Sequence, residues 1–154
     1  MSHRISQDAL YDHCPRVVTH LLALGKVDPQ ADIPASLQHL VKLRVSQVNH
    51  CCFCQHMHAQ EARQDGEQQE RLDVLPAWRE APCFSEKEQA ALAWAEALTQ
   101  ISSAPVSDAV YQDAVLQFGE NALVELTTLI LEINSWNRIS VGFQFSPDMQ
   151  ASVL

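Results

Sequence analysis

The chain has 154 residues, of which 47% are hydrophobic and 19% charged, and this balance is typical of a globular rather than a disordered protein. Its 10 basic and 19 acidic residues give a formal net charge of −9, which argues against a nucleic-acid surface because such a surface needs a basic patch. Only 4 glycines and 6% aromatic residues disfavour a turn-rich β-sandwich.

The N-terminal residues contain no basic region followed by an apolar stretch, and no segment approaches about 18 uncharged apolar residues. We therefore expect no signal peptide, no membrane span and a cytoplasmic location, where thiols stay mostly reduced. The chain has 5 cysteines, and three of them fall between positions 51 and 54. In a reducing compartment such clustering indicates metal binding or redox catalysis rather than a disulfide framework.

Helical signals follow one another along the N-terminal part of the chain. The apolar pattern over residues 8–24 predicts a short turn, interrupted by Pro15, and then a helix that ends at Gly25. Pro34 suits the first turn of the next helix, whose apolar positions over residues 37–48 repeat at helical spacing.

The next predicted helix runs from about residue 51 to residue 64, with Gly66 at its C-terminal cap. A short polar helix over residues 67–75 is then stopped by Pro76.

Three further helices are predicted in the C-terminal half. Ser85 and Glu88 form a capping box that starts a helix over residues 86–101, and helices over about 107–119 and 121–141 follow. No segment alternates with a period of two, so we predict an all-α fold, a bundle of about six or seven helices. With no linker and no internal repeat, residues 1–154 are expected to form a single domain.

The chemistry of the chain is concentrated between Asn49 and His58. At 100° per residue, a helical wheel places Cys51, Cys54, His58 and Glu61 on one face. Cys52 falls on the opposite face, and we expect it to be a small buried hydrophobic residue.

This arrangement suits thiol chemistry. Cys51 and Cys54 are three residues apart, so their side chains can meet, and they lie in the first turn of a helix, where the helix dipole favours a thiolate. His58 is within reach of Cys54 for proton transfer, and Glu61 could orient His58 from one turn further on. The alternative for Glu61 is an ordinary solvated helix charge.

The sequence also resembles a known family. The stretch over residues 40–49 and the motif Cys51-x-x-Cys54-x-x-x-His58 resemble the core of the alkylhydroperoxidase D family, within the carboxymuconolactone decarboxylase superfamily. The resemblance continues through Glu61-Ala62-Arg63 and Gly66, then Phe84-Ser85-x-x-Glu88, then Ala91 to Ala95, and ends at Ile133-Asn134-x-Trp136-Asn137-Arg138. It places the core motif within residues 37–66.

This resemblance implies an all-helical homo-oligomer that reduces organic hydroperoxides and is recharged by a dithiol partner such as a lipoyl-domain protein. Carried over by position, Cys54 is the thiol that attacks the peroxide, Cys51 is the resolving thiol and His58 relays the proton. The dithiol is itself the redox centre, so no bound cofactor and no metal are expected.

One position departs from the family pattern. The proton relay of the family usually includes a glutamate twelve positions before the first cysteine, and that position here is His39. We predict His39 as a further relay member, because an imidazole can also carry protons. The relay requires a chain turn near Asn49 and His50, where the family often has glycine, and Asn49 is the residue expected to tolerate the turn.

Other interpretations of the same residues remain open at this stage. Cys51, Cys54 and His58 could bind zinc, with His39 or His50 as the fourth ligand. A non-enzymatic redox or metal sensor and a lyase of the decarboxylase branch are the rival functions. The tryptophans at positions 94 and 136 lie on apolar stripes and are expected in the core or at a subunit interface rather than against substrate.

Overall fold

The computed structural model describes residues 4–149 and contains seven α-helices and no strand within that range. The all-α prediction is therefore confirmed, and so is the expected number of helices. The helices are α1 (Gln7–His13), α2 (Pro15–Leu24), α3 (Ala35–Val48), α4 (Cys52–Gln64), α5 (Gln69–Val74), α6 (Glu86–Thr99) and α7 (Asp108–Phe143), with short 3-10 turns η1 (Pro29–Ala31) and η2 (Leu75–Ala77). Residues 1–3 and 150–154 of the predicted domain lie outside the described residues.

Most helix ends fall where the sequence places them, but the segment before Pro15, predicted as a short turn, is the 7-residue helix α1. Ser85 accepts from the backbone N–H of Glu88 while the Glu88 carboxylate accepts from the N–H of Ser85, so the predicted capping box starts α6. Gly66 follows α4 with φ +92°, a conformation that glycine adopts without strain. Gly119 has φ 71° and ψ 169° inside α7, so this element is two helical segments joined at the predicted break.

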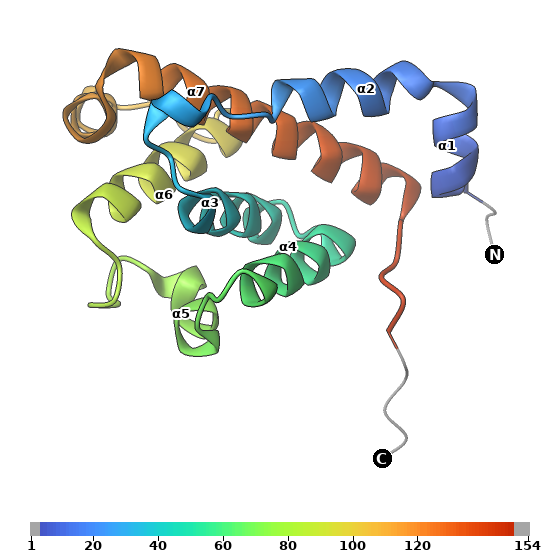
Figure 1. Cartoon of the computed structure of the whole chain (residues 1–154), viewed down its shortest axis with the longest axis horizontal. Coiled ribbons are helices and arrows are strands. Elements are labelled where there is room, and N and C mark those ends of the chain that lie inside the picture. The colour runs from blue at the N-terminus through green and yellow to red at the C-terminus, as the bar shows by residue number, and fades with distance from the viewer. Residues whose placement is uncertain (1–3, 150–154) are drawn as a thin grey trace.

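Helix α3 lies at the centre of the fold (Figure 1), and its two faces are therefore buried in different core clusters. Leu37, Val41 and Val45 pack with side chains of α6 and α7 in the larger cluster. Leu40 and Leu43 pack with α4, α5, η2 and α6 in the smaller cluster. Since α3 is anchored on both sides, the turn at its C-terminal end has a fixed position.

Among the described residues, α7 is long and apolar enough to cross a membrane. Its buried face, however, contributes Leu126, Leu129, Ile130 and Ile133 to the core, each at most 1% exposed. We therefore describe α7 as the long core helix of the bundle.

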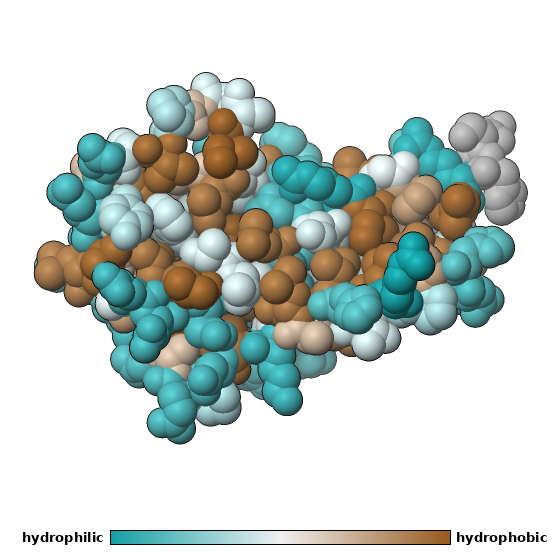
Figure 2. Space-filling model, turned by 90° about the horizontal axis from the view of Figure 1, so that it is seen from above, coloured by the Kyte–Doolittle hydropathy of each residue, from teal (hydrophilic) through white to brown (hydrophobic). Residues whose placement is uncertain are grey.

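Helices α1 and α2 form a separate layer that runs along the C-terminal part of α7, and neither helix has a fully buried residue (Figure 1). Seen over this layer, apolar side chains gather between polar ones (Figure 2). Leu22 and Leu24 of α2 and Val124 and Leu131 of α7 are exposed. This layer covers the space between α7 and α4, in which the cysteine pair lies.

Candidate active site

The turn between α3 and α4 brings the cysteines to the start of a helix. His50 takes a left-handed conformation with φ 55°, whereas Asn49 has φ −84°. The turn is present as predicted, but the expectation that Asn49 would adopt the unusual backbone was wrong. The side chain of Asn49 has another task, because its amide donates to Asn134 at 3.0 Å and to Asn137 at 2.9 Å.

These asparagines belong to a buried polar network that joins the turn to α7. Asn137 donates to the hydroxyl of Ser46 at 3.1 Å, and Asn134 donates to Thr99 of α6 at 3.0 Å. Because a buried amide must be hydrogen-bonded, this network fixes the distance between α3, α6 and α7. It therefore holds the cysteine-bearing turn against the core.

Cys51 and Cys54 are joined by a disulfide, with their Cα atoms 5.3 Å apart. Cys51 is the N-cap of α4, and its sulfur accepts from the backbone N–H of Cys54 at 3.2 Å. Both residues are buried. The structure therefore brings the predicted pair together in the core, at the N-terminus of a helix. Cys52 points away from them and is exposed, so its expected burial was wrong.

His58 lies one turn beyond Cys54 and is held by Glu61, whose carboxylate oxygen is 2.8 Å from Nδ1. This hydrogen bond, which outweighs partial burial, lowers the pKa of Glu61. Because a carboxylate can only accept, the neutral imidazole that pairs with it carries its proton on Nδ1 and has its lone pair on Nε2. Nε2 is buried and has no hydrogen-bond partner. The contact between Glu61 and His58 that the helical wheel predicts is therefore present, and the orienting role of Glu61 stays a prediction.

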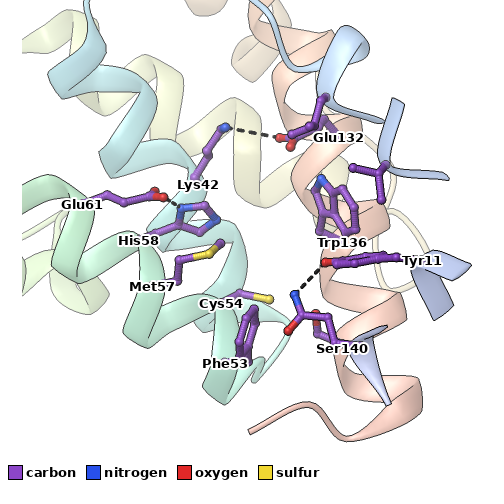
Figure 3. A pocket seen from close by; sticks show the side chains of 13 residues that line it. Tyr11, Lys42, Phe53, Cys54, Met57, His58, Glu61, Glu132, Trp136 and Ser140 are labelled. Carbon is purple, nitrogen blue, oxygen red and sulfur yellow. Dashed lines mark hydrogen bonds and ion pairs between the residues drawn. The ribbon is translucent and has the colours of Figure 1, made fainter. Parts of the chain in front are cut away.

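A cavity of about 310 Å³ adjoins the cysteine pair and His58. Cys54 and His58 line this cavity, whereas Cys51 does not. Figure 3 shows the sulfur of Cys54 and the ring of His58 facing the space between α4 and α7. Apolar and aromatic side chains from four helices form most of its wall: Tyr11, Val18, Leu22, Phe53, Met57 and Trp136. A cavity of this size and composition suits a small, mainly apolar molecule.

Several lining residues were not identified from the sequence. Trp136 packs against the larger core cluster, in line with the prediction, but it also packs edge-on against Tyr11, with ring centroids 6.4 Å apart, and lines the cavity. Lys42 of α3 and Glu132 of α7 form an ion pair across the cavity, with Nζ and Oε2 3.5 Å apart. Trp94, by contrast, is buried in the core as expected.

His39 lies near the other end of α4 from the cysteines. Its Nε2 is 2.6 Å from the carboxylate of Asp65, the C-cap of α4, and it is not among the residues that line the cavity. Its role in the relay stays a prediction. Within residues 4–149 no three His, Cys, Asp or Glu side chains come close enough to hold a metal ion, so the zinc alternative has no ligand set there.

The fold and the site together define a helical protein with a cysteine pair at a helix N-terminus, beside an apolar cavity. Residues 14–97 match the model of the carboxymuconolactone decarboxylase family. The uncharacterised protein YdfG of Bacillus subtilis is 38% identical over 92% of this chain and 95% of its own length. The chain therefore belongs to the carboxymuconolactone decarboxylase family.

Other relatives agree with this assignment. The uncharacterised protein YnjA of Escherichia coli is 30% identical over 77% of this chain and 62% of its own length. A crystal structure from Agrobacterium tumefaciens, of a protein of unknown function considered a candidate AhpD antioxidant defence protein, matches with a TM-score of 0.85. It is 31% identical and covers 95% of this chain and 99% of its own. The debrominase Bmp8 shares the fold alone, with a TM-score of 0.76, 17% identity and coverage of 91% and 76%.

Proposed function

We propose that this protein is a thiol peroxidase that reduces organic hydroperoxides through the Cys51–Cys54 pair. The observation that carries the proposal is the placement of the Cys54 sulfur and the free Nε2 of His58 on one apolar cavity. An apolar wall favours an organic hydroperoxide over hydrogen peroxide, since burial of its carbon body contributes to binding. The family and its AhpD-like relative are consistent with this chemistry.

In the proposed cycle the reduced protein meets the hydroperoxide in the cavity. The thiolate of Cys54 attacks the terminal peroxide oxygen, the O–O bond breaks, and the departing alkoxide takes a proton to leave as an alcohol. His58 takes the thiol proton and returns it to the leaving oxygen, while Glu61 keeps its Nε2 free for this task. Cys54 is left as a sulfenic acid.

The thiol of Cys51 then condenses with the sulfenic acid, releasing water and forming the disulfide. One hydroperoxide and two thiols thus give one alcohol, one water and one disulfide. A dithiol reductant, such as a lipoyl-domain protein, returns two electrons. Because Cys54 rather than Cys51 lines the cavity, its sulfur is the one a slender dithiol reaches. The Cys51 thiolate then leaves with the N–H of Cys54 directed at it.

The same proposal includes a single cytoplasmic domain that works as a homo-oligomer. Exposed apolar side chains on α2 and α7, including Leu22, Val124 and Leu131, support association with a second copy. Light scattering after size-exclusion chromatography tests this part of the proposal. Only a monomer at every concentration would refute it.

Two rival functions are weighed against the same residues. A stoichiometric sensor would use the disulfide once, so sustained turnover with hydroperoxide and a dithiol separates an enzyme from a sensor. A lyase of the decarboxylase branch has no need of the cysteine pair, and the buried disulfide therefore counts against it.

The decisive experiment is disulfide mapping by mass spectrometry after reduced protein meets about one equivalent of cumene hydroperoxide. We expect rapid formation of the Cys51–Cys54 disulfide and release of cumyl alcohol. Cys54→Ser should leave the peroxide unconsumed, whereas Cys52→Ser, a matched change at an exposed cysteine of the same helix, should react like the parent. Survival of both thiols in the parent would refute the proposal.

A further inference from the structure

One end of the cavity carries charge although most of its wall is apolar. Lys42 and Glu132 meet at this end, and Cys54, Phe53 and Ser140 lie at the other (Figure 3). The Glu132 side chain is only 5% exposed and that of Lys42 is 22% exposed. Burial of a charged pair beside an apolar cavity costs desolvation free energy, so a role in ligand recognition is a reason for its presence there.

The hydrogen-bonding capacity of this pair is not used up within the protein. Oε2 of Glu132 is buried and has no hydrogen-bond partner among residues 4–149, and the ammonium of Lys42 lies 3.5 Å from it. The backbone of Gly25, at the end of α2, packs against the same side chain, since a Cβ there would lie 2.7 Å from the Cγ and Cδ of Glu132. The carboxylate is therefore held in place at the cavity wall, with hydrogen-bonding capacity that the protein does not use.

The charges on the cavity wall do not cancel. The lining contains one ammonium, that of Lys42, and two carboxylates, those of Glu132 and Glu61. Glu61 is paired with the imidazole of His58, and Glu132 with Lys42, so no cation on the wall is free to receive an anion. The protein as a whole also has a formal charge of −9, which repels anions at long range.

We infer that the Lys42–Glu132 pair makes the cavity selective for uncharged, compact organic hydroperoxides, and that Glu132 is the residue that excludes hydroperoxides bearing a carboxylate. This inference rests on the proposed peroxidase function and names its substrate class. A hydroxyl or hydroperoxyl group can donate to Glu132 and accept from Lys42 at the same time. A carboxylate can only accept, so it would compete with Glu132 for Lys42 and meet repulsion from Glu132.

The size of the effect follows from Coulomb's law. Lys42 offsets one of the two carboxylates, so the wall keeps one net negative charge. At about 7 Å and an effective dielectric constant of about 20, such a charge disfavours a second anion by more than tenfold in rate. Solvent and counterions reduce this value near the cavity mouth. We therefore expect the parent to discriminate against the anionic substrate by about tenfold.

The test compares two hydroperoxides that differ in one group: a ring-carboxylated cumene hydroperoxide and its methyl ester. The pre-reduced, full-length protein is mixed with each, and the second-order rate of disulfide formation is measured by stopped flow. The ester should react about tenfold faster than the acid. Glu132→Gln leaves Lys42 as an unpaired cation, so the acid should gain on the ester by about tenfold or more.

A matched control separates local from long-range electrostatics. Glu120→Gln changes the net charge equally at an exposed position of α7 that does not line the cavity, and it should leave the acid-to-ester ratio unchanged. Equal rates for acid and ester in the parent would overturn the inference, as would an equal shift in both variants. If neither hydroperoxide oxidises the thiols, the proposed function itself fails and the inference fails with it.

Discussion

Glu61 offers a direct test of how the proton relay works. Its carboxylate accepts from Nδ1 of His58 at 2.8 Å and thereby leaves Nε2 free toward the cavity. Glu61→Gln keeps the shape of the side chain but removes the charge. Its amide can also donate to Nδ1, which would move the ring proton to Nε2 and block His58 as a base. We expect slower attack by Cys54 without loss of the fold.

The magnitude follows from exposure. A hydrogen bond to a charged group is worth about 1.5–3 kcal/mol when shielded from water. The side chain of Glu61 is 45% exposed, so solvent screening reduces the value to about 1 kcal/mol. This corresponds to a fall in rate of roughly fivefold. Truncation of the base itself, in His58→Ala, should cost about 10²- to 10⁴-fold.

The assay is stopped-flow oxidation of the reduced protein by cumene hydroperoxide as a function of pH. The His58 hydrogen bond lowers the pKa of Glu61, so its contribution is present above the ordinary glutamate pKa and is lost as the pH falls through the lowered value. Parent and Glu61→Gln should therefore differ near neutral pH and converge in acid. Glu70→Gln, an exposed change on α5, is the matched control. If Glu61→Gln matches this control at neutral pH while His58→Ala is slow, the orienting role is refuted.

Three other variants probe the fold and the cavity. Glu96 accepts from two arginines and a tryptophan. Glu96→Gln should therefore lower the free energy of unfolding by about 3–5 kcal/mol. In thermal denaturation, the melting temperature should fall by roughly 10 °C. His39→Glu should not raise peroxide turnover in a steady-state assay, because Glu61 already bonds the relay imidazole. Gly25→Ala forces a shift of Glu132, so the acid-to-ester rate ratio should rise while the melting temperature changes little.

Each of these variants has an outcome that contradicts its reasoning. The control for Glu96→Gln is Glu86→Gln, which removes an exposed charge from the same helix and should not alter the melting temperature. If Glu96→Gln and Glu86→Gln lower the melting temperature equally, Glu96 has no special role. A clear gain in turnover in His39→Glu would place that position in the relay. An unchanged acid-to-ester ratio in Gly25→Ala would mean that Glu132 does not select substrates.

The parts of the site that lie on one helix could be predicted from the sequence. Cys54, His58 and Glu61 are four and three residues apart, and helix geometry alone puts them on one face. The helical wheel also placed Cys52 on the other side, but it could not reveal whether that side is covered. In the folded chain Cys52 is exposed.

The cavity could not be predicted, because its wall is assembled from five helices, α1, α2, α3, α4 and α7, most of which are distant in sequence. Lys42, Glu132 and Trp136 carry no local signal for a site: each looks like an ordinary residue of an amphipathic helix. Only the packing of α1 and α2 over the gap between α4 and α7 turns them into lining residues. The left-handed backbone at His50 could not be predicted for the same reason, because Asn49 makes hydrogen bonds to residues of α7 that are distant in sequence.

The position of the relay carboxylate follows from the hairpin of α3 and α4. After the turn at His50, α4 runs back along α3, so His39 meets Asp65 at the end of α4 rather than the cysteines at its start. A carboxylate supplied from position 39 would depend on the packing of two helices. Glu61 instead reaches His58 from the same helix, at a spacing that helix geometry fixes. The orientation of the imidazole is thereby independent of small shifts between α3 and α4, and the relay role of His39 stays a prediction that His39→Glu tests.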